Sequence, residues 1–201
     1  MPPPNEQALI EASQEGDLDA FNQLVEAYQD RVYSIALRML RDHAAAEDAA
    51  QDAFLSAYRS IRQYRGGSFQ GWLLRIVRNA AYDMLRAQAR RRTESIEEDF
   101  VSFEAELVAG DPTPQEVALN AELGSQISNA LSHLPDDQRF AVVLVDIEGL
   151  SYDEAALAMS VSMGTLKSRV SRGRLKLREA LLTDPELLPA RFRPLDEGTE
   201  P

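Results

Sequence analysis

The sequence predicts an all-α protein of two small helical domains joined by an acidic, mostly irregular linker. Apolar residues recur every three or four positions through residues 17–92 and again through residues 126–183, the spacing of amphipathic helices. Residues 93–125, by contrast, show little helical period and contain the helix-breaking sequence GDPTP. Residues 1–16 and 184–201 remain as an N-terminal extension and a C-terminal tail. The two helical stretches are called here the N-terminal module (17–92) and the C-terminal module (126–183).

Composition limits the class of protein. The 201 residues are 44% apolar, enough to bury a core, and they include no cysteine, which excludes disulfides and thiolate metal sites. His43 and His133 are far apart and lack the spacing of metal ligands, so neither a metal nor a cofactor is expected. The N-terminus does not read as a signal peptide, and no apolar run approaches the roughly 20 residues that span a bilayer. We expect a cytoplasmic protein without stable membrane insertion.

The net charge of −12 is concentrated in the middle of the chain. Residues 1–92 hold 12 basic and 12 acidic side chains, whereas residues 93–138 hold 11 acidic ones and no Lys or Arg. Residues 139–201 are again nearly balanced, with 9 basic and 10 acidic side chains. Two interpretations remain open. The acidic stretch is either a solvated tether, or a strand that occupies a basic channel on a partner or covers the protein's own basic faces.

The N-terminal module begins with two predicted helices. The apolar seam of the first consists of Leu18, Phe21, Val25, Tyr28, Val32, Ile35 and Met39. The second follows Asp42, and its core-facing side consists of Ala49, Ala53, Phe54, Ala57, Tyr58 and Ile61. Its opposite edge is acidic and polar, formed by Glu47, Asp48, Gln51 and Asp52. Such an edge is either an ordinary solvated face or a docking surface for a basic partner.

A third helix follows the Gly66-Gly67 pair, which breaks the preceding helix, and Ser68 is a suitable N-cap for it. Its apolar side consists of Phe69, Leu73, Ile76, Val77, Ala80 and Met84, and its polar side of Arg75, Arg78, Asn79, Tyr82 and Arg86. Trp72 lies at the border. Arginines neutralise phosphates and aromatic rings stack on unpaired bases, so this face is typical of nucleic-acid binding. The alternative is an ordinary polar face whose Trp72 and Tyr82 belong to the core.

The C-terminal module reads as a series of short helices. Pro135 suits a first helical turn, and Gly149 a helix end. Ser151 and Glu154 form the pattern of a capping box for the next helix, and Ser162 can cap the last one after a three-residue turn. Two helices separated by so short a turn predict a helix-turn-helix, whose second helix enters the major groove of DNA.

The last helix is densely basic, with six Lys or Arg residues within positions 164–178. Its apolar stripe consists of Leu166, Val170 and Leu177, and its opposite side of Thr165, Ser168, Arg169, Arg172 and Lys176. Lys167, Arg174 and Arg178 flank that side. Small hydroxyl groups followed by cations suit base contacts followed by phosphate contacts. The alternative is a solvated basic helix that docks on an acidic protein.

These segments together resemble bacterial group 4 sigma factors, the extracytoplasmic function (ECF) type. The resemblance covers most of residues 17–182 and rests on DAFNQLVEAYQDRVYSIALRML, AEDAAQDAFLSAYRSI, FQGWLLRIVRNAAYDMLRAQARR, LPDDQRFAVVLVDIEGLSYDEAALAM and GTLKSRVSRGRLKLREAL, in that order. It implies that the N-terminal module is sigma region 2, a helical bundle, and the C-terminal module sigma region 4. The chain departs from the family in its long acidic linker and in its tail, to which the resemblance assigns no role.

The resemblance implies three sets of contact residues. Binding to the β′ clamp helices of core RNA polymerase maps onto Asp48, Gln51, Asp52 and Phe54. Melting of the −10 promoter element, with capture of a flipped base, maps onto Ser68, Phe69, Gln70 and Trp72, with Arg75, Asn79 and Arg86 along the DNA. Reading of the −35 element maps onto Thr165, Lys167, Ser168, Ser171 and Arg172, to which the helical pattern adds Arg169 and Lys176.

The expected function is therefore that of a promoter-specificity subunit that contacts the β′ and β subunits and promoter DNA but is not itself an enzyme. The resemblance further implies that the linker passes toward the RNA exit channel and that an anti-sigma factor blocks the polymerase-binding surfaces. Two rivals remain: a stand-alone helix-turn-helix regulator, which leaves the basic helix after Gly67 unexplained, and a helical adaptor that binds only proteins. No P-loop, zinc spacing or nucleophile triad signature supports an enzyme.

Overall fold

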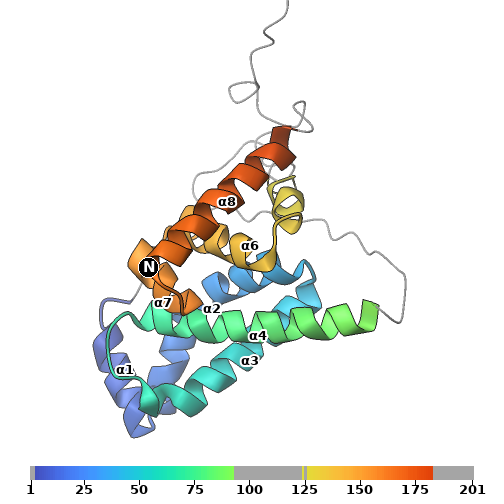
Figure 1. The fold of residues 1–201 in the computed structure, drawn as a ribbon. Coiled ribbons are helices and arrows are strands. Elements are labelled where there is room, and N and C mark those ends of the chain that lie inside the picture. The colour runs from blue at the N-terminus through green and yellow to red at the C-terminus, as the bar shows by residue number, and fades with distance from the viewer. Residues whose placement is uncertain (1–2, 93–123, 125, 183–201) are drawn as a thin grey trace, which may run out of the picture.

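The computed structural model describes residues 3–92, 124 and 126–182, and within them it contains helices and no strand, which confirms the all-α class (Figure 1). The elements are α1 (Glu6–Glu15), α2 (Leu18–Leu40), α3 (His43–Ser60), η1 (Ile61–Gln63), α4 (Phe69–Arg92), α6 (Asp136–Val142), η2 (Val143–Ile147), α7 (Tyr152–Met159) and α8 (Met163–Leu182). Residues 126–132 are also helical. Apart from residue 124, the predicted linker lies outside the described residues, and so does the tail.

The N-terminal module is a bundle in which α3 and α4 both pack against α2. Asp17 and Asp42 cap α2 and α3, each carboxylate accepting a hydrogen bond from the backbone three residues later. The buried side of α3 is formed almost entirely by alanines, which let neighbouring helices approach closely. The predicted apolar seams are largely confirmed, with two differences. Leu18, at the start of α2, is 54% exposed, and Tyr58 of α3 remains 39% exposed and stacks edge-on against Phe21.

The N-terminal extension contains a helix that the sequence analysis did not predict. Helix α1 packs against α2 and η1, with Leu9 and Ile10 buried. It ends at Gly16, whose φ of +106° lies in the left-handed region that favours glycine. Its ten residues show too short a periodic pattern to stand out, so only its packing reveals it as part of the fold.

The C-terminal module contains the predicted helix-turn-helix, formed by α7 and α8. The Ser151–Glu154 capping box is present, and the Ser162 hydroxyl accepts a hydrogen bond of 3.2 Å from the Thr165 backbone. The preceding helix differs from the prediction. Pro135 is its N-cap with extended backbone, not part of its first turn, and after Val142 the helix widens into the π-helical turn η2.

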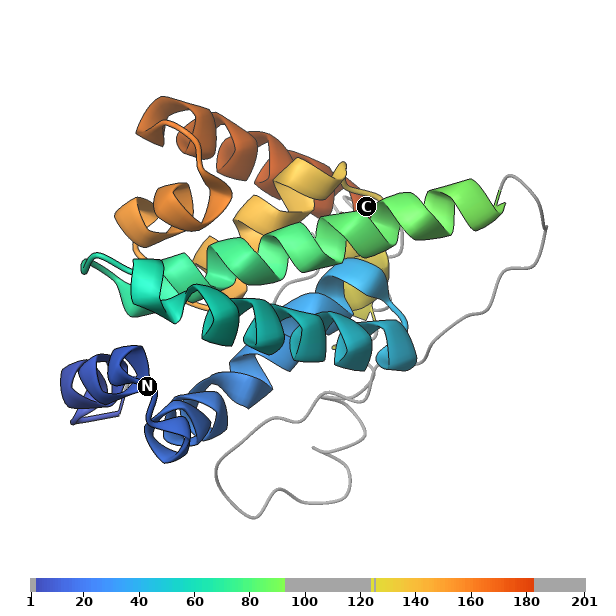
Figure 2. The same cartoon turned by 90° about the horizontal axis from the view of Figure 1, so that it is seen from below.

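The two modules pack against each other. Helix α4 lies between α3 on one side and the C-terminal helices on the other (Figure 2), and it contacts α7 along its first turns. Gly71 of α4 faces the Leu157 side chain, and a Cβ on that glycine would lie 3.0 Å from the leucine methyl. The sequence predicted each module by itself; their mutual contact comes from the tertiary structure.

Candidate nucleic-acid and polymerase interfaces

The predicted −35 residues lie mostly on the open side of α8. Leu166 and Val170 are buried against the rest of the module, which turns the opposite side of the helix outward. Ser168 is half-buried, and the exposed members of the set are Thr165, Lys167, Ser171, Arg172 and Lys176. Arg172 donates a hydrogen bond of 3.2 Å to the Ser168 hydroxyl. The side chain of Arg172 is therefore already oriented across the face that would meet the groove.

Arg169 is the exception within that set. Its side chain is 22% exposed and turns toward α6, where its Nη2 lies 2.5 Å from Oδ2 of Asp137. The helical pattern predicted that Arg169 faces outward with Thr165 and Arg172. A carboxylate on α6 instead holds the guanidinium between the two helices, so in this arrangement Arg169 does not share the exposed face.

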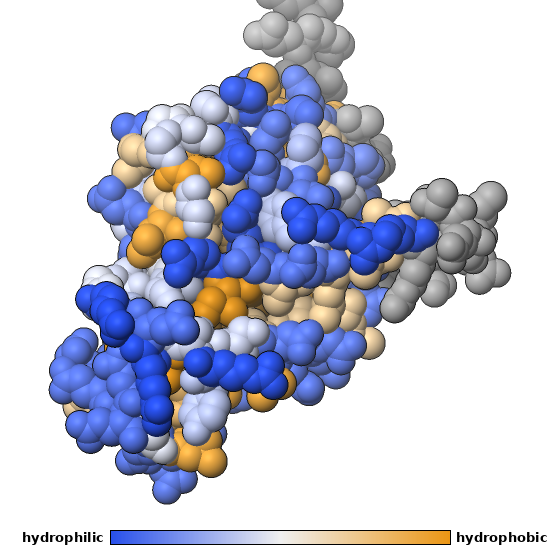
Figure 3. All heavy atoms as spheres, turned by 60° about the horizontal axis from the view of Figure 1, so that its bottom comes forward, coloured by the Kyte–Doolittle hydropathy of each residue, from blue (hydrophilic) through white to orange (hydrophobic). Residues whose placement is uncertain are grey.

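The predicted −10 residues on α4 remain exposed. Arg75, Asn79 and Arg86 point away from the core, and the Arg86 guanidinium lies 3.3 Å from the neighbouring Asp83 carboxylate. Figure 3 shows hydrophilic side chains running along α4, with small apolar patches beside them. This part of the polar face predicted for α4 is therefore available to a ligand.

Two further members of the polar side of α4 turn toward the C-terminal module. The Tyr82 hydroxyl donates a hydrogen bond of 2.8 Å to Oδ1 of Asp137, and Arg78 Nη2 lies 3.8 Å from the same oxygen. Burial and that hydrogen bond raise the pKa of Tyr82. Trp72 and Tyr82 both pack partly buried against the core, as the alternative interpretation predicted.

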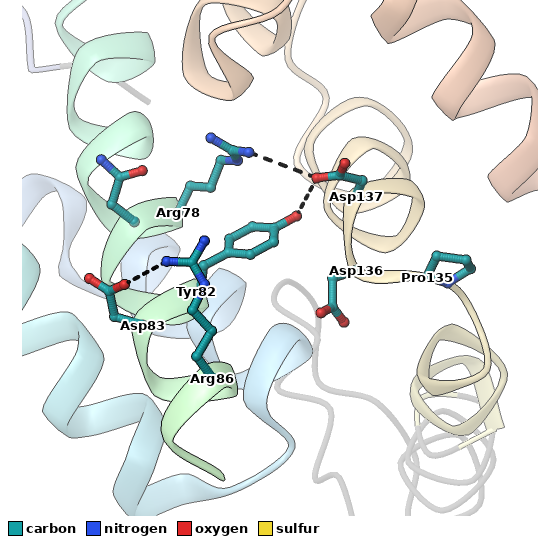
Figure 4. A pocket seen from close by; sticks show the side chains of 8 residues that line it. Arg78, Tyr82, Asp83, Arg86, Pro135, Asp136 and Asp137 are labelled. Atoms are coloured by element: carbon teal, nitrogen blue, oxygen red, sulfur yellow. Dashed lines mark hydrogen bonds and ion pairs between the residues drawn. The ribbon is translucent and has the colours of Figure 1, made fainter. Parts of the chain in front are cut away.

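A polar cavity separates this part of α4 from the start of α6 (Figure 4). It encloses about 680 Å³ and is lined by Arg78, Asn79, Tyr82, Asp83, Arg86, Pro135, Asp136 and Asp137. Cations of α4 face carboxylates of both helices, and the Asp137 contacts form one wall. The modules therefore meet through an electrostatic contact that covers part of the polar face of α4.

The predicted base-capturing loop precedes α4. Ser68 caps the helix by accepting a hydrogen bond of 3.1 Å from Gly71 and donates one of 3.2 Å to Glu154 of α7. Gln70 and Trp72 are half-buried. Phe69 is only 2% exposed and packs against Tyr28 of α2. Its position suits support of the loop from within the core more than contact with a base.

The acidic edge of α3 is open to solvent. Asp48, Gln51 and Asp52 are exposed on the side opposite the buried alanines, while Phe54 is partly buried behind them. Leu55 is 52% exposed on the same helix and was not singled out from the sequence. The sequence could have indicated Leu55, because it lies four residues after Gln51, one helical turn along the same side of α3. The edge thus combines carboxylates with an apolar group.

Glu148 and Arg139 join the modules through contacts that sequence reasoning missed. The Glu148 carboxylate pairs with Arg31 at 3.1 Å and with Arg38 at 3.5 Å, both on α2. Arg139, 8% exposed, donates a hydrogen bond of 2.7 Å to the carbonyl of Met39. Burial lowers the pKa of both Arg38 and Arg139, and the adjacent carboxylates oppose that shift.

Neither a metal centre nor a membrane segment is evident in the part of the chain that the structure describes. Within residues 3–92, 124 and 126–182, no three His, Cys, Asp or Glu side chains gather in a way that holds a metal ion. Over the same residues, none of the helices has the length and the apolar character that a bilayer crossing needs.

Two family models match the chain. The model of Sigma-70 region 2 matches residues 24–91, and the model of Sigma-70 region 4 matches residues 125–177. These ranges contain most of α2, all of α3 and nearly all of α4 in the first case, and α6, α7 and most of α8 in the second. The exposed faces of α3, α4 and α8 therefore lie in the matched parts, and α1 lies outside them.

Characterised relatives cover nearly the whole chain. The ECF RNA polymerase sigma-E factor of Escherichia coli K12 is 38% identical over 176 residues, 84% of this chain and 90% of that protein. The sigma-H factor of Pseudomonas aeruginosa is 37% identical over 183 residues, 88% of this chain and 93% of that protein. The ECF sigma factor SigE of Mycolicibacterium smegmatis is 41% identical over 164 residues, and there the match spans 82% of this chain but 62% of the relative.

Two solved structures share the fold of this chain. The sigma factor RpoE of Bartonella quintana, solved with the anti-sigma factor NepR, superposes with a TM-score of 0.66 at 29% identity, over 83% of this chain and 99% of that one. CnrH, solved with the cytosolic domain of CnrY, has the same fold, with a TM-score of 0.65 at 24% identity over 89% of this chain and 97% of that one. The chain therefore belongs to the ECF group of the sigma-70 family, the initiation factors that direct RNA polymerase to promoters.

Proposed function

We propose that the exposed faces of α8, α4 and α3 read the −35 element, open the −10 element and bind core polymerase, respectively. The observation that carries this assignment is the presence of two separate exposed basic surfaces in one chain. Arg172 and Lys176 are exposed on α8, while Arg75, Asn79 and Arg86 are exposed on α4. A stand-alone regulator explains only α8, and an adaptor explains neither surface.

The −35 assignment follows from the order of groups along α8. Thr165 and Ser168 lie near the start of the helix, where a recognition helix meets base edges in the major groove. Arg172 lies one turn further on and suits a bidentate contact with guanine. Lys176 follows on the same side, at a position for the phosphate backbone. Lys167 and Ser171 flank this row. Arg169 joins it once its contact with Asp137 is broken.

The −10 assignment combines the loop before α4 with the helix itself. Ser68, Gln70 and Trp72 border the loop and supply a hydroxyl, an amide and an aromatic ring to a flipped base. Stacking on an aromatic ring contributes about 1–3 kcal/mol per base, comparable with the few kcal/mol that unstacking costs. Phe69 supports this surface from the core. The arginines further along α4 follow the phosphates.

The polymerase contact is assigned to the acidic edge of α3. Asp48, Gln51 and Asp52 are exposed there, and a basic surface on the β′ clamp helices is the complementary partner. Phe54 lies partly buried behind them and keeps the edge in place. Contacts of the C-terminal module with the β subunit complete the complex. The polymerase performs the phosphoryl transfer, so the protein itself is a non-catalytic factor without a cofactor, acting in the bacterial cytoplasm.

The closed arrangement of the modules must open for this function. The −35 and −10 elements are centred about 25 base pairs apart, roughly 85 Å along B-form DNA. Here one carboxylate, that of Asp137, contacts Arg78 of α4 and Arg169 of α8 at 3.8 and 2.5 Å. While Asp137 holds α4 and α8 together, the two helices cannot bind the −10 and −35 elements at the same time. An anti-sigma factor, such as accompanies the Bartonella relative, is the proposed partner that keeps the chain inactive.

The domain boundaries are part of the same proposal. We divide the chain into an extension (1–16), region 2 (17–92), the acidic linker (93–125), region 4 (126–183) and the tail (184–201). The family matches to residues 24–91 and 125–177 support the inner limits of both domains, at residues 92 and 126, whereas the outer limits at residues 17 and 183 lie beyond the matches.

Run-off transcription with purified bacterial core polymerase and a pool of promoter fragments tests the proposal. We expect transcripts whose start sites share two spaced elements. Arg172→Ala abolishes the preference for one −35 sequence, whereas Arg59→Ala, an exposed change on α3, leaves it intact. Asp48→Lys with Asp52→Lys abolishes core binding, and the matched pair Glu26→Lys with Asp30→Lys on α2 does not. Binding of duplex DNA by the protein alone, without transcription, would instead favour the stand-alone regulator.

A further inference from the structure

One side chain of α1 reaches the segment that joins α3 to α4. The Gln14 amide donates hydrogen bonds of 3.0 Å to the carbonyl of Ile61 and 2.9 Å to the carbonyl of Tyr64. Both carbonyls lie at the end of the α3–η1 helix, where backbone oxygens have few partners within the helix. The Ile61 carbonyl also accepts a hydrogen bond of 3.0 Å from the Tyr64 backbone. Gln14 therefore fixes the backbone at the point where the proposed base-capturing loop begins.

Helix α1 is itself held firmly in the bundle, so Gln14 comes from a fixed support. Leu9 and Ile10 are buried, and Ser13, 1% exposed, donates a hydrogen bond of 2.6 Å to the Leu9 carbonyl. At the other end of the helix, Glu6 accepts a hydrogen bond from the Tyr28 hydroxyl of α2. The helix thus links the core of the bundle to the start of the loop.

Tyr64 passes this support on to the loop. Its side chain is 6% exposed, and its hydroxyl donates a hydrogen bond of 2.7 Å to the carbonyl of Gly67. The ring packs against Phe69 and Trp72, with centroids 5.7 and 5.4 Å away. Tyr64 thereby holds the loop backbone at Gly67 close to the start of α4. It also contacts Trp72, a proposed base contact.

The loop cannot maintain this shape by itself. Gly66 and Gly67 have φ values of +95° and +94°, and no atom lies within 4 Å of the position that a Cβ would take on either glycine. A glycine pair in open space has wide conformational freedom. The contacts that restrict it are Tyr64 on one side and the Ser68 cap on the other.

We propose that Gln14 and Tyr64 are positioning residues for the loop that reads the −10 element, and that α1 thereby contributes to promoter selectivity. This inference rests on the proposed function of the loop. Helix α1 precedes residue 24, where the region 2 match begins, so nothing in the family match assigns it a role. Recognition groups must keep their geometry within fractions of an ångström, so loss of the support reduces discrimination before it reduces folding.

The test compares transcription from promoters that differ at one −10 base. Gln14→Met keeps the length of the side chain but removes the donor, Gln14→Lys restores a donor, and Tyr64→Phe removes only the hydroxyl. We expect the ratio between matched and mismatched promoters to fall roughly three- to tenfold in the Met and Phe variants, as for one net hydrogen bond. The Lys variant recovers it. Gln7→Met is the matched control, because Gln7 bonds only to exposed Glu11 of the same helix.

Discrimination at the −35 element is the internal reference and stays unchanged in every variant. A lower melting temperature with an unchanged −10 ratio in Gln14→Met and Tyr64→Phe would overturn the inference and leave α1 a purely structural helix, provided that alanine at Ser68, Gln70 or Trp72 does alter the ratio. If those alanine variants also leave it unchanged, the −10 assignment of the loop fails and the inference fails with it.

Discussion

Arg78 of α4 and Arg169 of α8 share one carboxylate, that of Asp137 on α6. Their guanidinium nitrogens lie 3.8 and 2.5 Å from its two oxygens, and the Tyr82 hydroxyl lies 2.8 Å from the first. A carboxylate here takes the place that a DNA phosphate takes when arginines bind nucleic acid. One acidic side chain therefore neutralises a cation on each of the two helices that are proposed to contact the promoter.

Asp137→Asn is expected to open the modules. Removing the charge leaves two cations close together without their shared partner, and the contact is partly exposed, with Asp137 40% accessible. We expect the closed-to-open ratio to fall about fivefold, equivalent to about 1 kcal/mol. The chain has no cysteine, so dyes on Ser56→Cys and Arg178→Cys report the distance between modules by energy transfer.

Asp83→Asn is the control for this experiment. Asp83 belongs to the same cavity but pairs with Arg86 within α4 and is 75% exposed, so its loss leaves the contact between modules intact. Equal energy transfer in the Asp137→Asn and wild-type proteins would show that Asp137 does not hold the modules together.

Gly173→Ala is expected to destabilise the C-terminal module. A Cβ at this buried position would lie 2.6 Å from Cγ2 of Val142 and 3.1 Å from the carbonyl of Gln138. The backbone oxygen cannot move aside without disturbing α6, so α8 must shift away from it. Overpacking of this kind costs about 1–3 kcal/mol, measurable by urea unfolding.

Gly164→Ala provides the comparison, since the nearest atom to its added Cβ is 4.0 Å away. That change should leave the free energy of unfolding unchanged or slightly higher, because alanine favours helix. Addition of Val142→Ala should recover part of the loss in Gly173→Ala. Full stability of Gly173→Ala alone would contradict the proposed clash.

Glu154 is expected to make stability depend on pH in the acid range. The hydrogen bond from the Ser151 hydroxyl is the main cause that lowers the pKa of Glu154 below its usual value near 4.5. A lowered carboxyl pKa contributes stability that is present above the unfolded pKa and disappears as the pH falls through the folded one. Thermal melting of wild type and Glu154→Gln should differ at pH 7 and converge toward pH 3.

The difference at neutral pH should be about 1 kcal/mol, as for other helix caps. Asp153→Asn removes a carboxylate from the same turn without touching the capping box, and its melting temperature should run parallel to that of wild type. A gap between wild type and Glu154→Gln that stays constant down to pH 3 would rule out this linkage.

Lys176→Ala and Arg172→Ala should have different effects on DNA binding by the holoenzyme. Loss of a phosphate contact weakens binding to all sequences alike and lowers the slope of log K against log salt by about 1. Loss of a base contact weakens the preferred −35 sequence by about 1–3 kcal/mol and other sequences little. Titrations at several salt concentrations separate the two. Identical profiles would contradict the assigned order along α8.

Much of the local structure follows from the sequence by itself. The spacing of apolar residues predicted the cores of α2, α3, α4 and α8, because a helix must bury one continuous side. Ser151 and Ser162 predicted the starts of the two helices of the helix-turn-helix, and Gly149 predicted the end of the helix before them, because caps depend only on atoms a few residues apart. The basic face of α8 could also be predicted, because it follows from the spacing of Lys and Arg along a single helix. Together with the other segments it led to the correct family.

Only the tertiary structure decided how the modules and α1 are placed. Asp137, Glu148, Arg139 and Gln14 each act on residues from 32 to 117 positions away in the chain. No local pattern distinguishes such side chains from ordinary polar ones on a helix surface. Periodicity predicted that Arg78, Tyr82 and Arg169 face away from their own cores, and it could not show that those faces meet. Polar contacts between distant segments depend on where packing brings the helices, and that is a property of the whole fold.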